Sequence, residues 1–156
     1  GIGCDTSVLR SIAAARGMGM RRITGSMIGS RALVVLLFFG GLSALVGAGM
    51  AVVANGAGVP LEYLANSPFS SFLIPGLILG LVVGGTQLTA AISLLVKHRR
   101  APLLSAIAGL GMLIWIFTEL AIMGEYSPLQ AAYSALGVVE VVLVLVLLGI
   151  AGSVQA

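Results

Sequence analysis

The sequence has few charged residues and almost none of the side chains that bind metal ions. Charged residues make up 8% of the chain, whereas a soluble domain has about a quarter. The chain contains one histidine, His98, and one cysteine, Cys4. These two side chains exclude a bis-histidine haem site, a histidine-based metal site and a CxxC redox pair. We therefore expect no metal and no cofactor.

Residues that would form an active site are also missing. Serine and threonine are scattered, and no histidine lies within an apolar segment to activate a hydroxyl group. The glycines follow helical spacing and form no phosphate-binding loop. Without a nucleophile and a base, the sequence predicts a protein that is not an enzyme.

Apolar residues dominate what is present, at 59% of the 156 residues. They form long segments at about residues 32–54, 72–96, 102–123 and 129–150. A helix needs about 20 mostly apolar residues to cross a bilayer. The sequence therefore predicts an all-α membrane protein, a bundle of four transmembrane helices over residues 31–151 with a short tail at 152–156.

The basic residues fall on one side of this four-span pattern. They are Arg10, Arg16, Arg21, Arg22 and Arg31 before the first span, and Lys97, Arg99 and Arg100 between the second and third. Cytoplasmic segments of membrane proteins retain Lys and Arg during insertion. We therefore expect both termini to be cytoplasmic and the protein to lie in a bacterial cytoplasmic membrane.

The first 30 residues form a basic N-terminal segment. Gly17, Gly19, Gly25 and Gly29 weaken a long helix there, because each glycine costs about 1 kcal/mol relative to alanine in a helix interior. We expect a segment that is partly disordered or lies in the membrane interface. Its few arginines adjoin a span, so anionic lipid headgroups are the expected contacts and nucleic acid is not.

The loops on the other side of the membrane are short. The sequence at 55–60 ends the first span, and residues 61–71 suit a short helix on the outer surface. Residues 124–128 leave so little chain between the third and fourth spans that these two must form an antiparallel hairpin.

Small residues recur along one face of the second span. Gly76, Gly80 and Gly84 repeat every four residues, and such a stripe lets helix backbones approach closely in lipid. The stripe has two interpretations. It packs within the chain, or it docks another membrane subunit or a second copy of the protein.

Glu140 is the main functional candidate, because it falls near the middle of the fourth span. An ionised carboxylate there costs several kcal/mol unless it is paired, protonated or hydrated. Gln130, Tyr133 and Gly137 lie on the same face of that helix, at spacings of three and four residues. Gln87 in the second span lies at a similar depth, so we predict a Gln87–Glu140 hydrogen bond. The glutamate then has a structural role, handles protons or cations, or contacts a subunit.

A second acidic residue lies closer to the outer surface. Glu119 is about one turn from the outer end of the third span, and in a tight hairpin it falls opposite Tyr133. Trp115 and Tyr126 would complete an aromatic and acidic cluster there, with Glu125 and Gln130 nearby. Glu119 either reaches the interface or tyrosine, or marks an outer entrance to Glu140.

Four stretches resemble small four-span integral membrane proteins that are common in actinobacterial-type genomes and mostly uncharacterised. These stretches are residues 67–69 (Ser-Pro-Phe), 74–77 (Ile-Pro-Gly-Leu), 115–119 (Trp-Ile-Phe-Thr-Glu) and 127–130 (Ser-Pro-Leu-Gln), with Tyr133 and Gly137 following. The resemblance covers about residues 32–149 and implies a compact four-helix membrane domain without an assigned activity. Small multidrug transporters also have four spans, but their key glutamate lies in the first helix, which has no ionisable residue here.

Two functional hypotheses follow. The first is a non-enzymatic accessory or scaffolding subunit of a larger membrane complex, for example one that handles lipid or envelope precursors. The second is a small carrier or channel in which Glu140, aided by Gln87, binds a proton or cation. A water-lined path to Glu140 would favour transport, and a dry Glu140 with lipid or a partner against the Gly76 face would favour the subunit.

Overall fold

The computed structural model describes residues 6–149 except 57, 66 and 125, with side chains from residue 27 onward. The helices are α1 (Thr6–Val53), α2 (Leu73–Ile78), α3 (Gly85–Leu95), α4 (Ala101–Met123) and α5 (Pro128–Leu147), with the 3₁₀ helix η1 (Leu61–Leu64) and the π-helical η2 (Leu79–Gly84). Because α2, η2 and α3 follow one another without a break, they form one continuous second span.

The predicted all-α architecture with four spans is confirmed. Within the part of the chain that the structure describes, four helical segments are long and apolar enough to cross a membrane: Met27–Val53, Leu73–Leu95, Ala101–Met123 and Pro128–Leu147. Their ends lie within a few residues of the predicted ends, except that the first helix starts earlier. The predicted end of the fourth span at 150 and the tail at 152–156 lie outside the described residues.

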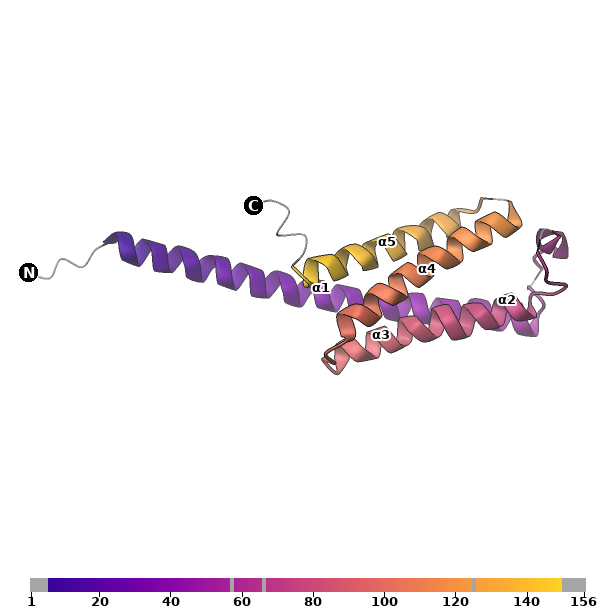
Figure 1. Ribbon diagram of the computed structural model, residues 1–156, viewed down its shortest axis with the longest axis horizontal. Helices are drawn as coiled ribbons and strands as arrows, with labels where there is room; N and C mark the ends of the chain where they lie inside the picture. The colour runs from indigo at the N-terminus through magenta and orange to yellow at the C-terminus, as the bar shows by residue number, and fades with distance from the viewer. Residues whose placement is uncertain (1–5, 57, 66, 125, 150–156) are drawn as a thin grey trace, which may run out of the picture.

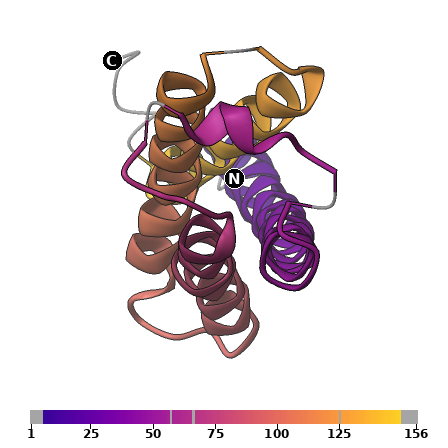
Figure 2. The same cartoon turned by 90° about the vertical axis from the view of Figure 1, so that its right-hand side faces the viewer.

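The four spans form a closed bundle in which each packs against its neighbours in sequence, and α5 returns to α1 (Figures 1 and 2). The α3–α4 turn, the end of α5 and the N-terminal part of α1 lie toward one end, which we call the basic end (Figure 1). The loop containing η1 and the α4–α5 turn lie at the opposite, distal end. The two sets of basic residues therefore share one end, as the topology prediction requires.

Helix α1 differs from the sequence-based expectation. It is a single helix of 48 residues, so residues 6–30 are helical and continuous with the first span instead of forming a separate, partly disordered segment. The part before the apolar window projects beyond the bundle (Figure 1). The helix persists because Ala, Arg, Met, Leu and Ile surround the glycines, and these residues favour the helix enough to offset them. The span itself also removes the cost of nucleating a new helix.

The second span contains one wide turn. At the end of η2 the amide of Gly85 donates to the carbonyl of Gly80, five residues back. The Thr86 hydroxyl donates to the carbonyl of Val82 at 2.7 Å, and the Thr89 hydroxyl to that of Gly85 at 2.7 Å. Such threonine bonds supply partners to carbonyls where a helix in lipid departs from regular geometry. The wide turn changes the rotation, around the helix axis, of every later side chain in the second span, including Gln87.

The glycine stripe of the second span packs against α1 of the same chain. A methyl group on Gly76 would lie 2.7 Å from Cβ of Ala51, and one on Gly80 would lie 2.8 Å from Cβ of Ala48. In a regular helix, residues four apart drift about 40° around the axis at each step. The π-helical turn rotates less per residue, so it keeps the glycines on one face. Of the two interpretations of the stripe, the structure agrees with the first, packing within the chain.

The distal loop is fixed to the bundle. The amide of Phe72 donates to Oδ1 of Asn55 at 3.1 Å, which joins the end of α1 to the start of the second span. Leu64 and Phe72 are buried. Viewed from the distal end, η1 crosses over the end of the bundle (Figure 2). The predicted short helix in this loop is therefore confirmed, as a single 3₁₀ turn.

Candidate functional site

The interior of the bundle contains two apolar clusters. The basic-end cluster consists of Leu33, Leu37, Ala90, Ala91, Ala108 and Val144. The distal cluster consists of Ala44, Val83 and Met112, with Leu79, Trp115, Tyr133 and Leu136 packed against it. Between the two clusters each span contributes a buried residue, and the four meet at the same level: Gly40, Gln87, Gly109 and Glu140. These four residues define a polar layer across the middle of the bundle.

The predicted hydrogen bond between Gln87 and Glu140 is confirmed. Nε2 of Gln87 donates to Oε2 of Glu140 at 2.8 Å. Both side chains are 0% exposed, so neither touches lipid or the space outside the bundle. The bond joins α3 to α5 across the interior and crosses between spans that are not consecutive in the chain.

Glycines on the other two spans make room for this pair. A methyl group on Gly40 of α1 would lie 3.1 Å from Oε1 of Gln87 and 3.3 Å from Cε of Met112. A methyl group on Gly109 of α4 would lie 3.2 Å from Cβ of Glu140. All three distances are shorter than most Cβ contacts in proteins. The polar layer therefore depends on glycine at two positions that carry no polar group.

One oxygen of each partner is left without a hydrogen bond. Within the described residues, Oε1 of Gln87 and Oε1 of Glu140 are buried and have no partner. A buried polar group without a partner costs about 1–3 kcal/mol. Ser105, also 0% exposed, is satisfied, because its hydroxyl donates to the carbonyl of Ala101 at 2.9 Å. Among the side chains that the structure describes, the buried atoms without a hydrogen-bond partner are thus confined to the Gln87–Glu140 pair.

The predicted polar face of α5 points into the bundle. Gln130, Gly137 and Glu140 are buried, and Tyr133 is partly buried. Gln130 has a structural role, because its Oε1 accepts the amide hydrogen of Ser127 at 2.9 Å in a capping box at the start of α5. The spacing of Ser127 and Gln130 is a known signature of this cap, and sequence reasoning missed it.

The predicted outer cluster around Glu119 forms only in part. Trp115 and Tyr133 both pack against the distal cluster. Glu119 is partly buried, and among the described residues no hydrogen bond joins it to Tyr133. Tyr126 is 70% exposed and is not among the residues packed against the distal cluster. Glu125, predicted nearby, lies outside the described residues.

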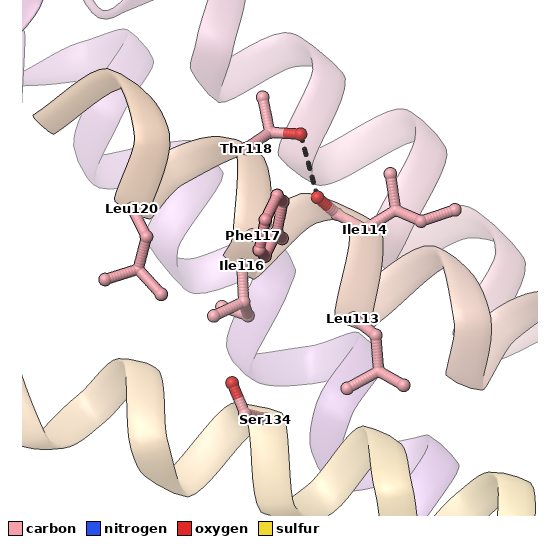
Figure 3. Close-up of a pocket in the computed structure, with 7 residues that line it drawn as sticks. All are labelled: Leu113, Ile114, Ile116, Phe117, Thr118, Leu120 and Ser134. Atoms are coloured by element: carbon pink, nitrogen blue, oxygen red, sulfur yellow. Dashed lines mark hydrogen bonds between the residues drawn. The ribbon is translucent and has the colours of Figure 1, made fainter. Parts of the chain in front are cut away.

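A hollow of about 410 Å³ lies on the outer surface of α4 and α5 (Figure 3). Its lining is Leu113, Ile114, Ile116, Phe117, Thr118 and Leu120 of α4, with Ser134 of α5. Ile114 and Phe117 are more than two-thirds exposed, so this surface faces the surrounding membrane. The Thr118 hydroxyl is bonded to the carbonyl of Ile114 at 2.8 Å. No residue of the polar layer lines the hollow, and it therefore gives no access to Glu140.

Comparison of the chain with models of known protein families, with curated proteins and with solved structures finds no match. Among the described residues, no group of three or more His, Cys, Asp or Glu side chains is placed to hold a metal ion. The spans identify a multi-pass integral membrane protein. Its candidate site is the buried Gln87–Glu140 pair, and any function has to be inferred from the chain's own residues.

Proposed function

We propose that the protein is a non-enzymatic accessory or scaffolding subunit of a larger membrane complex. In this proposal the four-helix bundle anchors the chain in a bacterial cytoplasmic membrane, and the basic N-terminal part of α1 contacts an acidic surface of the partner on the cytoplasmic side. Lipids surround the bundle, and a complex that handles lipid or envelope precursors fits this setting.

The observation that carries the proposal is the extent of α1 beyond its apolar window. The apolar window of α1 is Met27–Val53, whereas the helix begins at Thr6. At 1.5 Å per residue, residues 6–26 extend the helix by about 30 Å, and this part projects from the bundle (Figure 1). It contains four arginines and no acidic residue. A positively charged helix at a membrane surface attracts anionic partners.

The sealed polar layer supports an anchoring role. Apolar clusters lie on both sides of the Gln87–Glu140 pair, and both side chains are fully buried. The partner is not expected to dock on the Gly76, Gly80 and Gly84 stripe, because α1 already covers it. This shifts the expected contact from the membrane face to the projecting helix.

Site-specific crosslinking in the native host tests the proposal. A photo-crosslinking amino acid at Ala14 captures the partner, and the double variant Arg10→Gln with Arg16→Gln should abolish that crosslink. These two arginines lie well before the span, so their removal leaves the residues that orient the helix in place. Arg99→Gln with Arg100→Gln is the matched control, since it removes the same charge at the same end from the exposed α3–α4 turn.

The proposal requires one protein that is captured by the wild type and by the control pair but lost from the Arg10 and Arg16 variant. Capture that is equal for all three proteins would show that the basic helix is not the contact. Capture no greater than that by an unrelated membrane protein carrying the same probe would rule against an accessory subunit.

A proton- or cation-linked carrier that uses Glu140 is the second candidate. The observation that favours it is an acidic side chain near the middle of a span, next to an amide oxygen without a partner. Intramembrane acids of this kind mark ion pathways in many transporters. Flux into sealed vesicles that contain the purified protein tests this candidate. Flux that Glu140→Gln abolishes would support a carrier, and flux equal to that of empty vesicles would exclude it.

A further inference from the structure

The two unpartnered oxygens of the polar layer belong to the two residues that already share a hydrogen bond. Nε2 of Gln87 is paired with Oε2 of Glu140, which leaves Oε1 of Gln87 and Oε1 of Glu140. Both leftover atoms are acceptors when Glu140 is a carboxylate. A carboxylic acid, however, has one O–H donor. One proton on Glu140 therefore supplies the donor that both oxygens lack.

We propose that Gln87 and Glu140 form a proton-binding site. One proton taken from water binds to Oε1 of Glu140, and this O–H group donates to Oε1 of Gln87. Together with the bond from Nε2 of Gln87 to Oε2 of Glu140, it closes a cyclic pair of two hydrogen bonds between an acid and an amide. The proton stays in the ring, and no covalent bond between the residues forms or breaks.

A proton fits this site better than a metal cation. Hard cations such as calcium take six to eight oxygen ligands, and magnesium requires six in near-octahedral geometry. The polar layer offers the oxygens of one amide and one carboxyl group, and the two other helices contribute glycines. Gly40 lies directly against Oε1 of Gln87, so little space remains for further ligands or water.

The charged and titratable groups of the four spans are too far away to neutralise a carboxylate at Glu140. On α1, Arg31 is exposed and lies about 14 Å along the helix from Gly40. On α4, Glu119 lies about 15 Å from Gly109, and on α5, Tyr133 lies about 10 Å from Glu140. The second span, Leu73–Leu95, has no charged residue. An ionised Glu140 would therefore have one N–H donor and no opposite charge.

The site makes the stability of the bundle depend on pH with a defined sign. The folded protein holds the proton in the ring, whereas an exposed glutamate in the unfolded chain gives it up at lower pH. Because the folded state then binds more protons than the unfolded state, stability falls as pH rises. The loss begins at the pH where the glutamate of the unfolded chain releases its proton, and it is complete once Glu140 of the folded protein has released its own.

Infrared spectroscopy of the full-length protein in lipid vesicles tests the protonation state directly. At neutral pH the wild type should show a protonated carboxyl band that Glu140→Gln removes. Glu119→Gln is the matched control, because it removes the other intramembrane acid and should leave this band in place. In Gln87→Leu the band should shift to higher frequency, since the acid loses its hydrogen-bond partner. If Glu140→Gln removes no band at neutral pH, the proposal is wrong.

Thermal unfolding as a function of pH gives a second, independent test. The wild-type midpoint should fall as the pH is raised, whereas that of Glu140→Gln should stay flat, because two amides form the same ring without a titrating proton. Gln87→Glu should be stable at acid pH and lose more stability than the wild type at alkaline pH. A wild-type profile as flat as that of Glu140→Gln would overturn the proposal.

Replacing choline chloride with sodium or potassium chloride separates a proton site from a cation site. The wild-type midpoint should not change with the cation. A rise with sodium or potassium that is absent in Glu140→Gln would assign the site to that cation and reject the proton. The inference goes beyond the accessory-subunit proposal and fails independently of it, because none of these measurements involves the basic part of α1 or a partner.

Discussion

Gly109 of α4 and Gly137 of α5 face each other across the hairpin at backbone distance. A methyl group on Gly109 would lie 3.3 Å from the carbonyl oxygen of Gly137, and one on Gly137 would lie 3.2 Å from that of Gly109. This reciprocal contact brings the two helices together next to Glu140. It closes the α4 side of the polar layer without any polar side chain from α4.

Gly109→Ala should therefore destabilise the bundle. The new methyl group would meet Val141, Glu140 and the backbone of Gly137, and overpacking of this kind costs about 1–3 kcal/mol. Gly111→Ala is the control on the same helix, where a methyl group would meet nothing within 4 Å. It should be neutral or stabilising by up to about 1 kcal/mol from helix propensity. Thermal unfolding in mild detergent measures both, and equal midpoints for the two variants would contradict the close contact.

Gly80→Leu should disrupt the contact between the first and second spans. A Cβ atom at this position would already lie 2.8 Å from Cβ of Ala48, and a leucine adds three more carbons. Gly85→Leu tests the same substitution in the same span, at a position with nothing within 4 Å. We expect loss of folded protein or a clear drop in unfolding midpoint for Gly80→Leu alone. Should both variants behave like the wild type, the stripe does not pack on α1.

Gln130→Ala should lower stability by about 1 kcal/mol, the typical cost of losing a helix cap. The amide of Ser127 would lose its acceptor at 2.9 Å. Gln130→Glu should retain most of the stability, because glutamate serves the same position in a capping box. The unfolding midpoints of the wild type, Gln130→Ala and Gln130→Glu test this prediction. If Gln130→Glu is as unstable as Gln130→Ala, the cap is not the reason that Gln130 is buried.

Cysteine labelling on intact cells tests the predicted orientation. In a Cys4→Ser background, Glu62→Cys in η1 and Tyr126→Cys in the α4–α5 turn should react with an impermeant thiol reagent. Lys97→Cys in the α3–α4 turn should react only after the cells are opened. All three positions are exposed, so access across the membrane decides the result. Labelling of Lys97→Cys alone would invert the topology and place the basic end outside.

The spans and the central hydrogen bond could be predicted because both follow from depth in the membrane. Hydropathy and helix length locate the spans to within a few residues. The positions of the basic residues predict which ends of the spans lie together. Gln87 and Glu140 lie on spans that run in the same direction, at similar distances from the helix ends. Lipid excludes an isolated polar pair, so two such residues at one depth are expected to meet.

Helix rotation and close backbone contact could not be read from the sequence. Lipid and protein are both apolar, so the pattern of Gly76, Gly80 and Gly84 does not tell which helix covers it. Gly109 continues a stripe of small residues on the third span, after Ala101 and Ser105, and this signal was overlooked. The long α1 was also missed, because glycine propensity was given more weight than the continuity of a helix with a membrane span.

The wide turn at η2 (Leu79–Gly84) makes the bundle more sensitive to changes in chain length than to changes in side chain. One extra residue is accommodated there, and removing it would restore an ordinary helix. Every later residue of the span would then rotate by about 100° around the axis, which would carry Gln87 away from Glu140 and toward another face. Homologous chains that keep the pair should therefore conserve the number of residues between Gly76 and Gln87 even where the residues themselves change.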